Sequence, residues 1–146
     1  MANRTIINRF GEMKGWNSIT VNLLGRDLEG IIALKYNDSE SKENVYGSGK
    51  FPVGRSRGNY EAESSITIYK EELDGLRLSL GPGRRIMDIA PFDIVVQYEN
   101  AIGEILTDRI RNCEFKNDGV EVAQGDGTIS TECELIVSHI DYNVIL

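Results

Sequence analysis

The sequence predicts a mainly β domain, an antiparallel barrel or sandwich of about seven strands with one flanking α-helix and one long protruding loop. Three observations support this fold class. Strand-like segments follow one another with tight turns between them, which favours antiparallel pairing. One segment switches from a two-residue period to a helical period. One polar, glycine-rich stretch is too long for an ordinary connection.

The chain of 146 residues has the length of a single domain, here residues 1–146. Hydrophobic residues make up 40% of it and charged residues 27%, which is typical of a globular protein with a core. No apolar run approaches the roughly 20 residues that span a bilayer, and the N-terminus lacks an apolar signal region. We therefore expect no contact with a membrane, and a protein that stays in the cytoplasm or leaves it inside a larger particle.

Charge and cysteine content exclude several classes of site. The formal net charge of −7 argues against tight capture of nucleic acid, which needs Lys and Arg against phosphates. The two cysteines, Cys113 and Cys133, have no CxxC spacing, so no zinc site is predicted. In a reducing compartment we expect both thiols to be buried as small apolar side chains. No cofactor is predicted.

The strand predictions rest on apolar alternation bounded by turn residues. They cover residues 20–24, 31–36, 60–68, 92–98, 104–116, 120–123 and 128–142. The first two are expected on either side of a turn at 25–27, and a hairpin loop is expected at 100–103. The run 92–98 is apolar on both faces, which suits a central strand. The apolar parity of 104–116 shifts along the strand, so we expect a bulge or bend near 109–112.

One strand runs straight into the predicted helix. Strict alternation over 60–68 leaves Glu61 and Glu63 on a wet face, opposite a buried one. The apolar residues then recur four, three and four positions apart, at Tyr69, Leu73, Leu76 and Leu80. This spacing predicts one helical stripe that Gly81-Pro82 brings to an end.

The stretch 37–58 predicts a long, polar, glycine-rich loop. Part of it, GSGKFPVGRSRG, is basic, but it lacks the GxxxxGK[ST] spacing of a phosphate-binding loop. Two aromatic residues, Tyr46 and Phe51, flank its basic tip, and this combination fits a protein–protein contact better.

Catalytic patterns are weak. A Ser-His-Asp set would have to use His139, the single histidine, and no GxSxG motif accompanies it. The pairs Glu61/Glu63 and Glu132/Glu134 would each lie roughly 6.5–7 Å apart on one strand face, which is close to glycosidase spacing. Same-face acids on a strand are more often a solvated surface. We therefore predict no enzyme and no catalytic or metal-binding residue.

Four stretches of the chain resemble the tail tube proteins of long-tailed bacteriophages and, more distantly, the ring-forming tube protein of type VI secretion systems. They are GNYEAESSITIYKEELDGL at 58–76, IAPFDIVVQYEN at 89–100, DRIRNCEFKNDGVEVAQGDGTISTECELIVSHI at 108–140 and the loop at 37–58. The loop occupies the position of the family's inter-subunit arm. Together these stretches cover most of residues 19–142.

The resemblance implies a virion structural protein, assembled in the bacterial host cytoplasm into hexameric rings that stack as a hollow tube. DNA, or a protein cargo in related particles, would pass through the lumen without specific binding. Implied partners are further copies of the chain, and the sheath, tape measure, baseplate and terminator proteins of a tail. The arm is expected to be mobile in the monomer and to order on stacking.

The same resemblance implies two groups of site residues. The candidates for contact between stacked rings are Tyr46, Phe51, Val53 and Arg55. The candidates for the channel wall are Glu61, Glu63, Glu132 and Glu134. These glutamates could equally face outer solvent or a ring neighbour.

Two other interpretations stay open. One is a tail terminator or baseplate ring protein of related fold. The other is a small β-sandwich module that binds glycan or peptide through exposed aromatic residues such as Trp16, Tyr60 and Tyr69.

Overall fold

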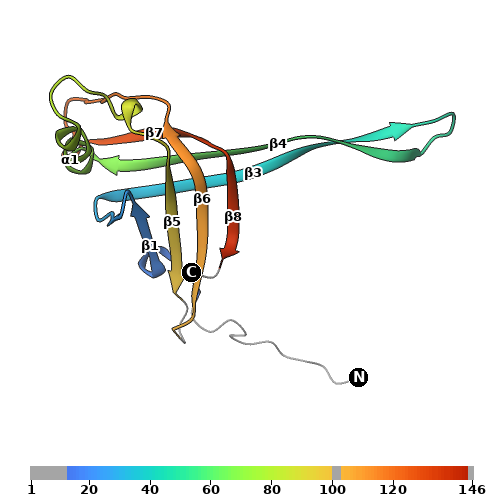
Figure 1. Ribbon diagram of the computed structural model, residues 1–146, viewed down its shortest axis with the longest axis horizontal. Helices are drawn as coiled ribbons and strands as arrows, with labels where there is room; N and C mark the ends of the chain where they lie inside the picture. Colours follow the sequence, from blue (N-terminus) through green and yellow to red (C-terminus); the bar gives the residue numbers. More distant parts are fainter. Residues whose placement is uncertain (1–12, 100–102, 145–146) are drawn as a thin grey trace.

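The computed structural model describes residues 13–99 and 103–144 (Figure 1). Its strands are β1 (Ile19–Leu23), β2 (Arg26–Asp27), β3 (Ile31–Tyr46), β4 (Pro52–Tyr69), β5 (Phe92–Glu99), β6 (Ile105–Phe115), β7 (Ser130–Val137) and β8 (His139–Val144). Helix α1 (Lys70–Leu80) follows β4. Of two 3-10 turns, η1 (Trp16–Ser18) precedes β1 and η2 (Ile86–Asp88) lies between α1 and β5. The hairpin loop expected at 100–103 falls largely outside the described residues.

All strand pairs are antiparallel, in the order β2-β1-β5-β6-β7-β4-β3, with β8 paired to β6. Strand β6 joins two layers, because most of it pairs with β5 and β8 while its end pairs with β7. Figure 1 shows β3, β4 and β7 crossing over β5, β6 and β8. The mainly β, antiparallel fold with one helix is confirmed. Among the described strands the sheet is not closed into a barrel, since β2 and β3 end the path.

The core lies between the two layers and is closed at one end by α1. Its most deeply buried side chains include Leu23, Ile66, Ile68, Leu73, Ile86, Ile94, Val96, Ile110, Cys113 and Cys133. Burial raises the pKa of the Cys113 thiol to about 12 and that of Cys133 to about 11, so both stay protonated near neutral pH. The prediction of two buried, unpaired cysteines is confirmed.

The direct join of strand and helix is also confirmed. On β4, Ser64, Ile66 and Ile68 are buried. Tyr69 keeps an extended backbone as the N-cap of α1, and the helix then buries Leu73 and Leu76. No loop is needed, because the amides at the join find acceptors on neighbouring segments. Tyr69 N donates to Gly30 O at 2.8 Å and Lys70 N donates to Ile129 O at 2.9 Å.

The expected bulge in the long strand is present. Phe92 pairs with Cys113 and Ile94 pairs with Ile110, so β6 has one residue more than β5 between these pairs. Asn112 adopts a positive φ of 57° there, and its amide donates to Asp93 Oδ1 at 3.0 Å. The extra residue returns both Ile110 and Cys113 to the core side, which explains the shifted parity.

Three strand predictions were wrong. Residues 128–142 are two strands rather than one, because the chain leaves β4 after Val137 and joins β6 from His139. Ser138 lies at the switch, where its amide donates to Arg111 O at 3.1 Å. Residues 120–123 have no strand partner in the described part of the chain. The strands at 20–24 and 31–36 do not flank one turn, since β1 pairs with β2 and β5 while β3 pairs with β4.

Candidate assembly surfaces

The segment predicted as a long loop is a two-stranded β-ribbon. Strands β3 and β4 pair from Ile31↔Ile68 out to Tyr46↔Pro52, and the ribbon projects far from the body (Figure 1). The prediction of a loop was therefore wrong, although the segment does protrude. The backbone N–H and C=O groups of each strand form hydrogen bonds with those of the other. A polar sequence that buries no core can therefore still form two β-strands. That the free arm is mobile and orders on stacking stays a prediction.

A bulge divides the ribbon in two. Between the pairs Glu40↔Tyr60 and Lys42↔Arg57, Ser41 stands opposite both Gly58 and Asn59. A Cβ atom at Gly58 would lie 2.9 Å from Ser41 Cβ, so a glycine lets the strands approach here. We define the arm as residues 42–57, the part of the ribbon beyond this bulge.

The arm has a basic side and an apolar tip. Lys42 pairs with Arg57 and Asn44 with Arg55, which places both arginines on one side of the ribbon. Arg55 Nε donates to Asn44 Oδ1 at 3.3 Å. At the tip, Tyr46, Phe51 and Val53 are 63%, 74% and 73% exposed, and Lys50 Nζ lies 5.8 Å from the Phe51 ring centroid. All four predicted contact residues therefore lie on the arm; what they contact stays a prediction.

The base of the ribbon is held by a tyrosine–aspartate network that the sequence analysis missed. Tyr36 on β3 donates to Asp108 Oδ2 on β6 at 2.5 Å, and its hydroxyl lies 2.5 Å from that of Tyr98 on β5. The other oxygen of Asp108 accepts from Asn143 N on β8 at 3.0 Å. Burial first, and then the bond to Asp108, raise the pKa of Tyr36 far above its usual range.

A second carboxylate extends this network towards the arm. Asp38 accepts from Tyr60 on β4 at 2.7 Å and from Tyr142 on β8 at 3.4 Å. The Tyr60 hydroxyl in turn accepts from Ile140 N at 3.3 Å. The network thus ties the layer that carries the arm to the other layer. Sequence spacing gives no signal for it, because its members are brought together only by the crossing of the two layers.

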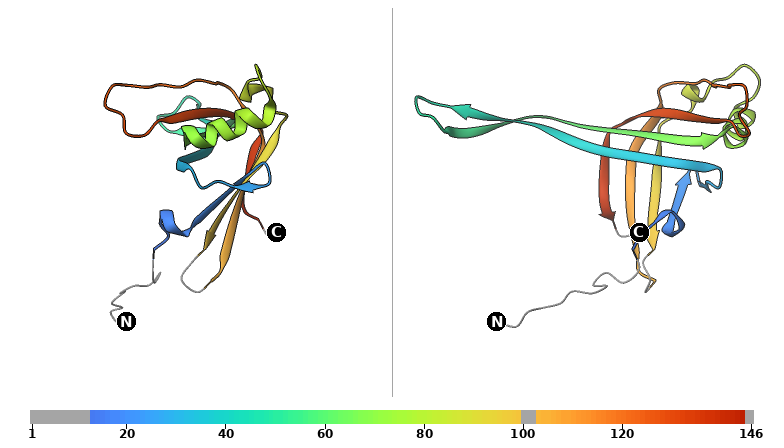
Figure 2. Two further views of the ribbon diagram at one scale, coloured as in Figure 1. Left: turned by 90° about the vertical axis from the view of Figure 1, so that its left-hand side faces the viewer. Right: turned by 180° about the vertical axis from the view of Figure 1, so that it is seen from behind.

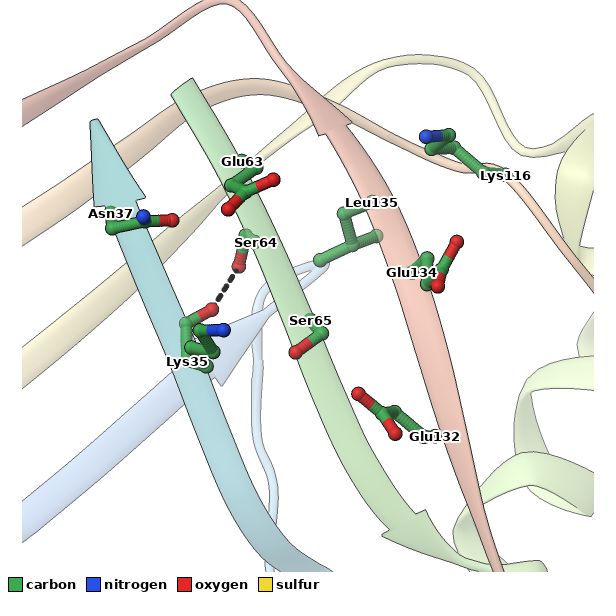
Figure 3. A pocket seen from close by; sticks show the side chains of 9 residues that line it. All are labelled: Lys35, Asn37, Glu63, Ser64, Ser65, Lys116, Glu132, Glu134 and Leu135. Atoms are coloured by element: carbon green, nitrogen blue, oxygen red, sulfur yellow. Dashed lines mark hydrogen bonds between the residues drawn. The ribbon is translucent and has the colours of Figure 1, made fainter. Parts of the chain in front are cut away.

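The solvent-exposed faces of β4 and β7, which we call the wet face, form one continuous surface. Ser65 pairs with Glu134 and Thr67 with Glu132, so both glutamates of β7 lie beside Glu63 of β4 on the side away from the core. Figure 3 shows them around a shallow pocket of about 300 Å³. The structure therefore brings together three of the four predicted channel residues. Two lysines, Lys35 and Lys116, line the same pocket and offset part of its negative charge.

The fourth candidate, Glu61, lies further along β4 towards the arm. It pairs with Ser39 and lines a separate hollow that also includes Ser41, Gly58 and Asn59. Its side chain is exposed and shares the parity of Glu63. The wet face therefore extends from β7 to the base of the arm.

The single histidine lies beside a serine and an aspartate. Ser138 Oγ is 3.1 Å from His139 Nδ1, and His139 Nε2 is 3.8 Å from Asp141 Oδ1. Asp141 also faces Arg111 at 3.8 Å, and the histidine side chain is half-exposed. This arrangement lacks the water-excluded setting that makes such groups effective in catalysis. These side chains form polar contacts with one another on the solvent-exposed side of β6 and β8.

The open antiparallel sheet with one flanking helix and a long projecting ribbon is a fold shared with chains of contractile injection systems. The solved structures similar to this chain come from such particles, which confirms at the level of fold the resemblance drawn from the sequence. No protein-family model matches the chain, and no curated protein matches it either.

Three solved structures illustrate the similarity. A chain of the sheath-tube complex of an extracellular contractile injection system, PVC, in its extended state superposes with a TM-score of 0.67 at 14% identity, covering 97% of this chain and 100% of that one. A chain of the tube terminating cap of the anti-feeding prophage superposes with a TM-score of 0.56 at 12% identity, covering 97% of this chain and 93% of that one. A chain of the baseplate of the anti-feeding prophage superposes with a TM-score of 0.54 at 9% identity, covering 84% of this chain and 89% of that one.

Proposed function

We propose that this protein is a structural subunit of the tail tube of a phage or a phage-like contractile particle. Hexameric rings of it stack into a hollow tube that conducts DNA during ejection. Within a tail its further partners are the sheath, tape measure, baseplate and terminator proteins, and assembly takes place in the host cytoplasm. The role is structural rather than enzymatic, as it is for the tube, cap and baseplate components of similar fold.

The observation that carries this proposal is the arm. A paired ribbon with an apolar, largely exposed tip makes no contribution to the core of its own chain. Exposed aromatic and apolar side chains on a projecting element are the features of a protein–protein contact. Tyr46, Phe51, Val53 and Arg55 are therefore proposed to contact the next ring.

The wet face of β4 and β7 is proposed as the channel wall. Glu61, Glu63, Glu132 and Glu134 would then present carboxylates to the passing DNA, and like charges keep a polyanion from adhering. Lys35 and Lys116 reduce this repulsion without cancelling it, because the carboxylates outnumber them on the same surface.

A cap or baseplate ring protein is the second candidate function. Two of the similar structures favour it, since one belongs to a tube terminating cap and the other to a baseplate. Such proteins would occur as one ring, whereas a tube subunit would repeat along the particle.

Negative-stain electron microscopy of the purified full chain separates the two candidates. The tube proposal expects long hollow tubes of uniform width, and size-exclusion chromatography should show material far larger than one ring. Isolated rings would support the cap or baseplate role instead. A strictly monomeric protein at high concentration would contradict both.

A further inference from the structure

The connection between β6 and β7, residues 116–129, forms an exposed loop at the end of the molecule that α1 occupies (Figures 1 and 2). We call it the end loop. Asp118 anchors it through an ion pair with Arg77 of α1, and its other oxygen accepts from Ile86 N at 3.4 Å. Beyond this anchor, Val120 and Val122 are exposed, Val122 to 62%. A loop of this length that is tied down at its base and exposes apolar side chains is suited to contact another molecule.

The end loop and the arm carry opposite charge. The end loop holds three carboxylates, Asp118, Glu121 and Asp126, of which Asp118 is paired with Arg77, and one basic residue, Lys116, at its start. The arm holds four basic residues and one acidic residue, a net charge of +3, so the remainder of the chain sums to −10. Each surface also presents apolar side chains, the valines on the loop and Tyr46, Phe51 and Val53 on the arm. The two surfaces therefore match in charge and in apolar character.

The two surfaces cannot meet within one chain. The tip of the arm lies at the start of β4 and α1 lies at its end, so the 18 residues of β4, at about 3.3 Å per residue, place the tip roughly 55 Å from the helix. Figure 1 shows them at opposite ends of the long axis. A contact between different surfaces of two copies is heterologous, and it repeats into a ring or an open-ended stack.

We propose that the arm of one copy docks on the end loop of a second copy, with Tyr46 and Phe51 packed against Val120 and Val122 and with Lys50 and Arg55 beside Glu121 and Asp126. This inference rests on the proposed function and adds the receptor surface for the arm. The apolar contacts supply most of the affinity, while the charges select the orientation and speed the encounter.

Cysteine cross-linking tests the contact directly. The full chain carrying Phe51→Cys and Val122→Cys is assembled, oxidised and run on a non-reducing gel. The native thiols do not interfere, because Cys113 and Cys133 are buried and protonated. A ladder of covalent multimers is expected, and the control Phe51→Cys with Glu99→Cys should give none. A wild-type chain that forms no assembly overturns both proposals, whereas assembled tubes without a ladder overturn only this contact.

Charge reversal gives an independent readout. Glu121→Lys should raise the concentration needed for assembly roughly tenfold or more, since it sets like charges against each other. Adding Lys50→Glu to the same chain should restore most of the loss. Glu99→Lys changes the net charge equally and should assemble as the wild type does. Wild-type assembly by Glu121→Lys, or no rescue in the folded double variant, would overturn the proposed contact.

Discussion

The hydroxyl of Tyr36 on β3 donates a 2.5 Å hydrogen bond to the carboxylate of Asp108 on β6, and this bond joins the strand that carries the arm to the centre of the other layer. Asp108 is buried, so its carboxylate oxygens need such hydrogen-bond donors. Asn143 N supplies another donor, from β8. Because the arm is long, a small movement at its base displaces its tip by a larger distance. A rigid base is therefore needed if the tip is to bind a neighbouring molecule in a single orientation.

Tyr36→Phe should lower the free energy of unfolding by about 1–3 kcal/mol, because it leaves an oxygen of the buried Asp108 without its hydroxyl donor. Denaturant unfolding followed by circular dichroism measures the change. Tyr142→Phe is the matched control, since it removes an exposed hydroxyl that lies 3.4 Å from Asp38, and its cost should stay below about 0.5 kcal/mol. Equal losses of unfolding free energy in the two variants would show that the bond to Asp108 adds no more stability than an exposed hydroxyl does.

The raised pKa of Tyr36 predicts a loss of stability in alkali. Burial and the bond to Asp108 favour the neutral phenol in the folded protein, so folding is supported fully below the unfolded pKa of about 10. As the pH rises further, the unfolded chain releases this proton and the folded chain holds it. Unfolding free energies should therefore fall by up to about 1.4 kcal/mol per pH unit from this residue. Tyr36→Phe should show a correspondingly shallower decline above pH 10, and parallel curves would contradict the assignment.

The body of the fold could be predicted from sequence because its signals are local. Alternation along β4, the helical spacing after Tyr69 and the parity shift around Asn112 each reflect burial within one segment, and the structure confirms them. The switch at Ser138 could not be predicted, since both β7 and β8 are good strands and only their partners differ.

The arm and the surface of β4 and β7 could not be predicted, because they depend on pairing between strands rather than on local sequence patterns. Residues 42–57 have no apolar periodicity because neither face of the ribbon is buried, so a composition argument indicates a loop where cross-strand pairing makes a strand. The grouping of Glu63 with Glu132 and Glu134 depends on the register of β4 against β7, which neither strand encodes alone. The individual candidate residues could therefore be named, but not their arrangement.

Gly30→Ala should destabilise the protein by about 1–3 kcal/mol, because the added methyl group would overlap Cγ of the buried Glu72 on α1. The Gly30 amide also donates to Glu72 Oε1 at 3.2 Å. Displacement of the Glu72 side chain would therefore break this bond and disturb the packing of α1. Thermal unfolding gives the measurement. Gly49→Ala, at an open position in the ribbon turn, should change stability by less than about 0.5 kcal/mol. A stability loss no larger at Gly30 than at Gly49 would contradict the close approach of Gly30, just before β3, to Glu72 of α1.

Replacing residues 42–57 by a two-residue Asn-Gly turn should leave the body folded and abolish stacking. No arm side chain belongs to the core, and the ribbon up to Glu40 and Tyr60 keeps its pairing and its tyrosine–aspartate base. The midpoint of thermal unfolding should stay within about 4 °C of the wild-type value, since less than about 1 kcal/mol is removed from the body. Electron microscopy should then show single rings or monomers in place of tubes. Tubes of normal length from this variant would exclude the arm as the stacking element. An unfolded product would show instead that residues 42–57 are needed for the body to fold, which contradicts the prediction.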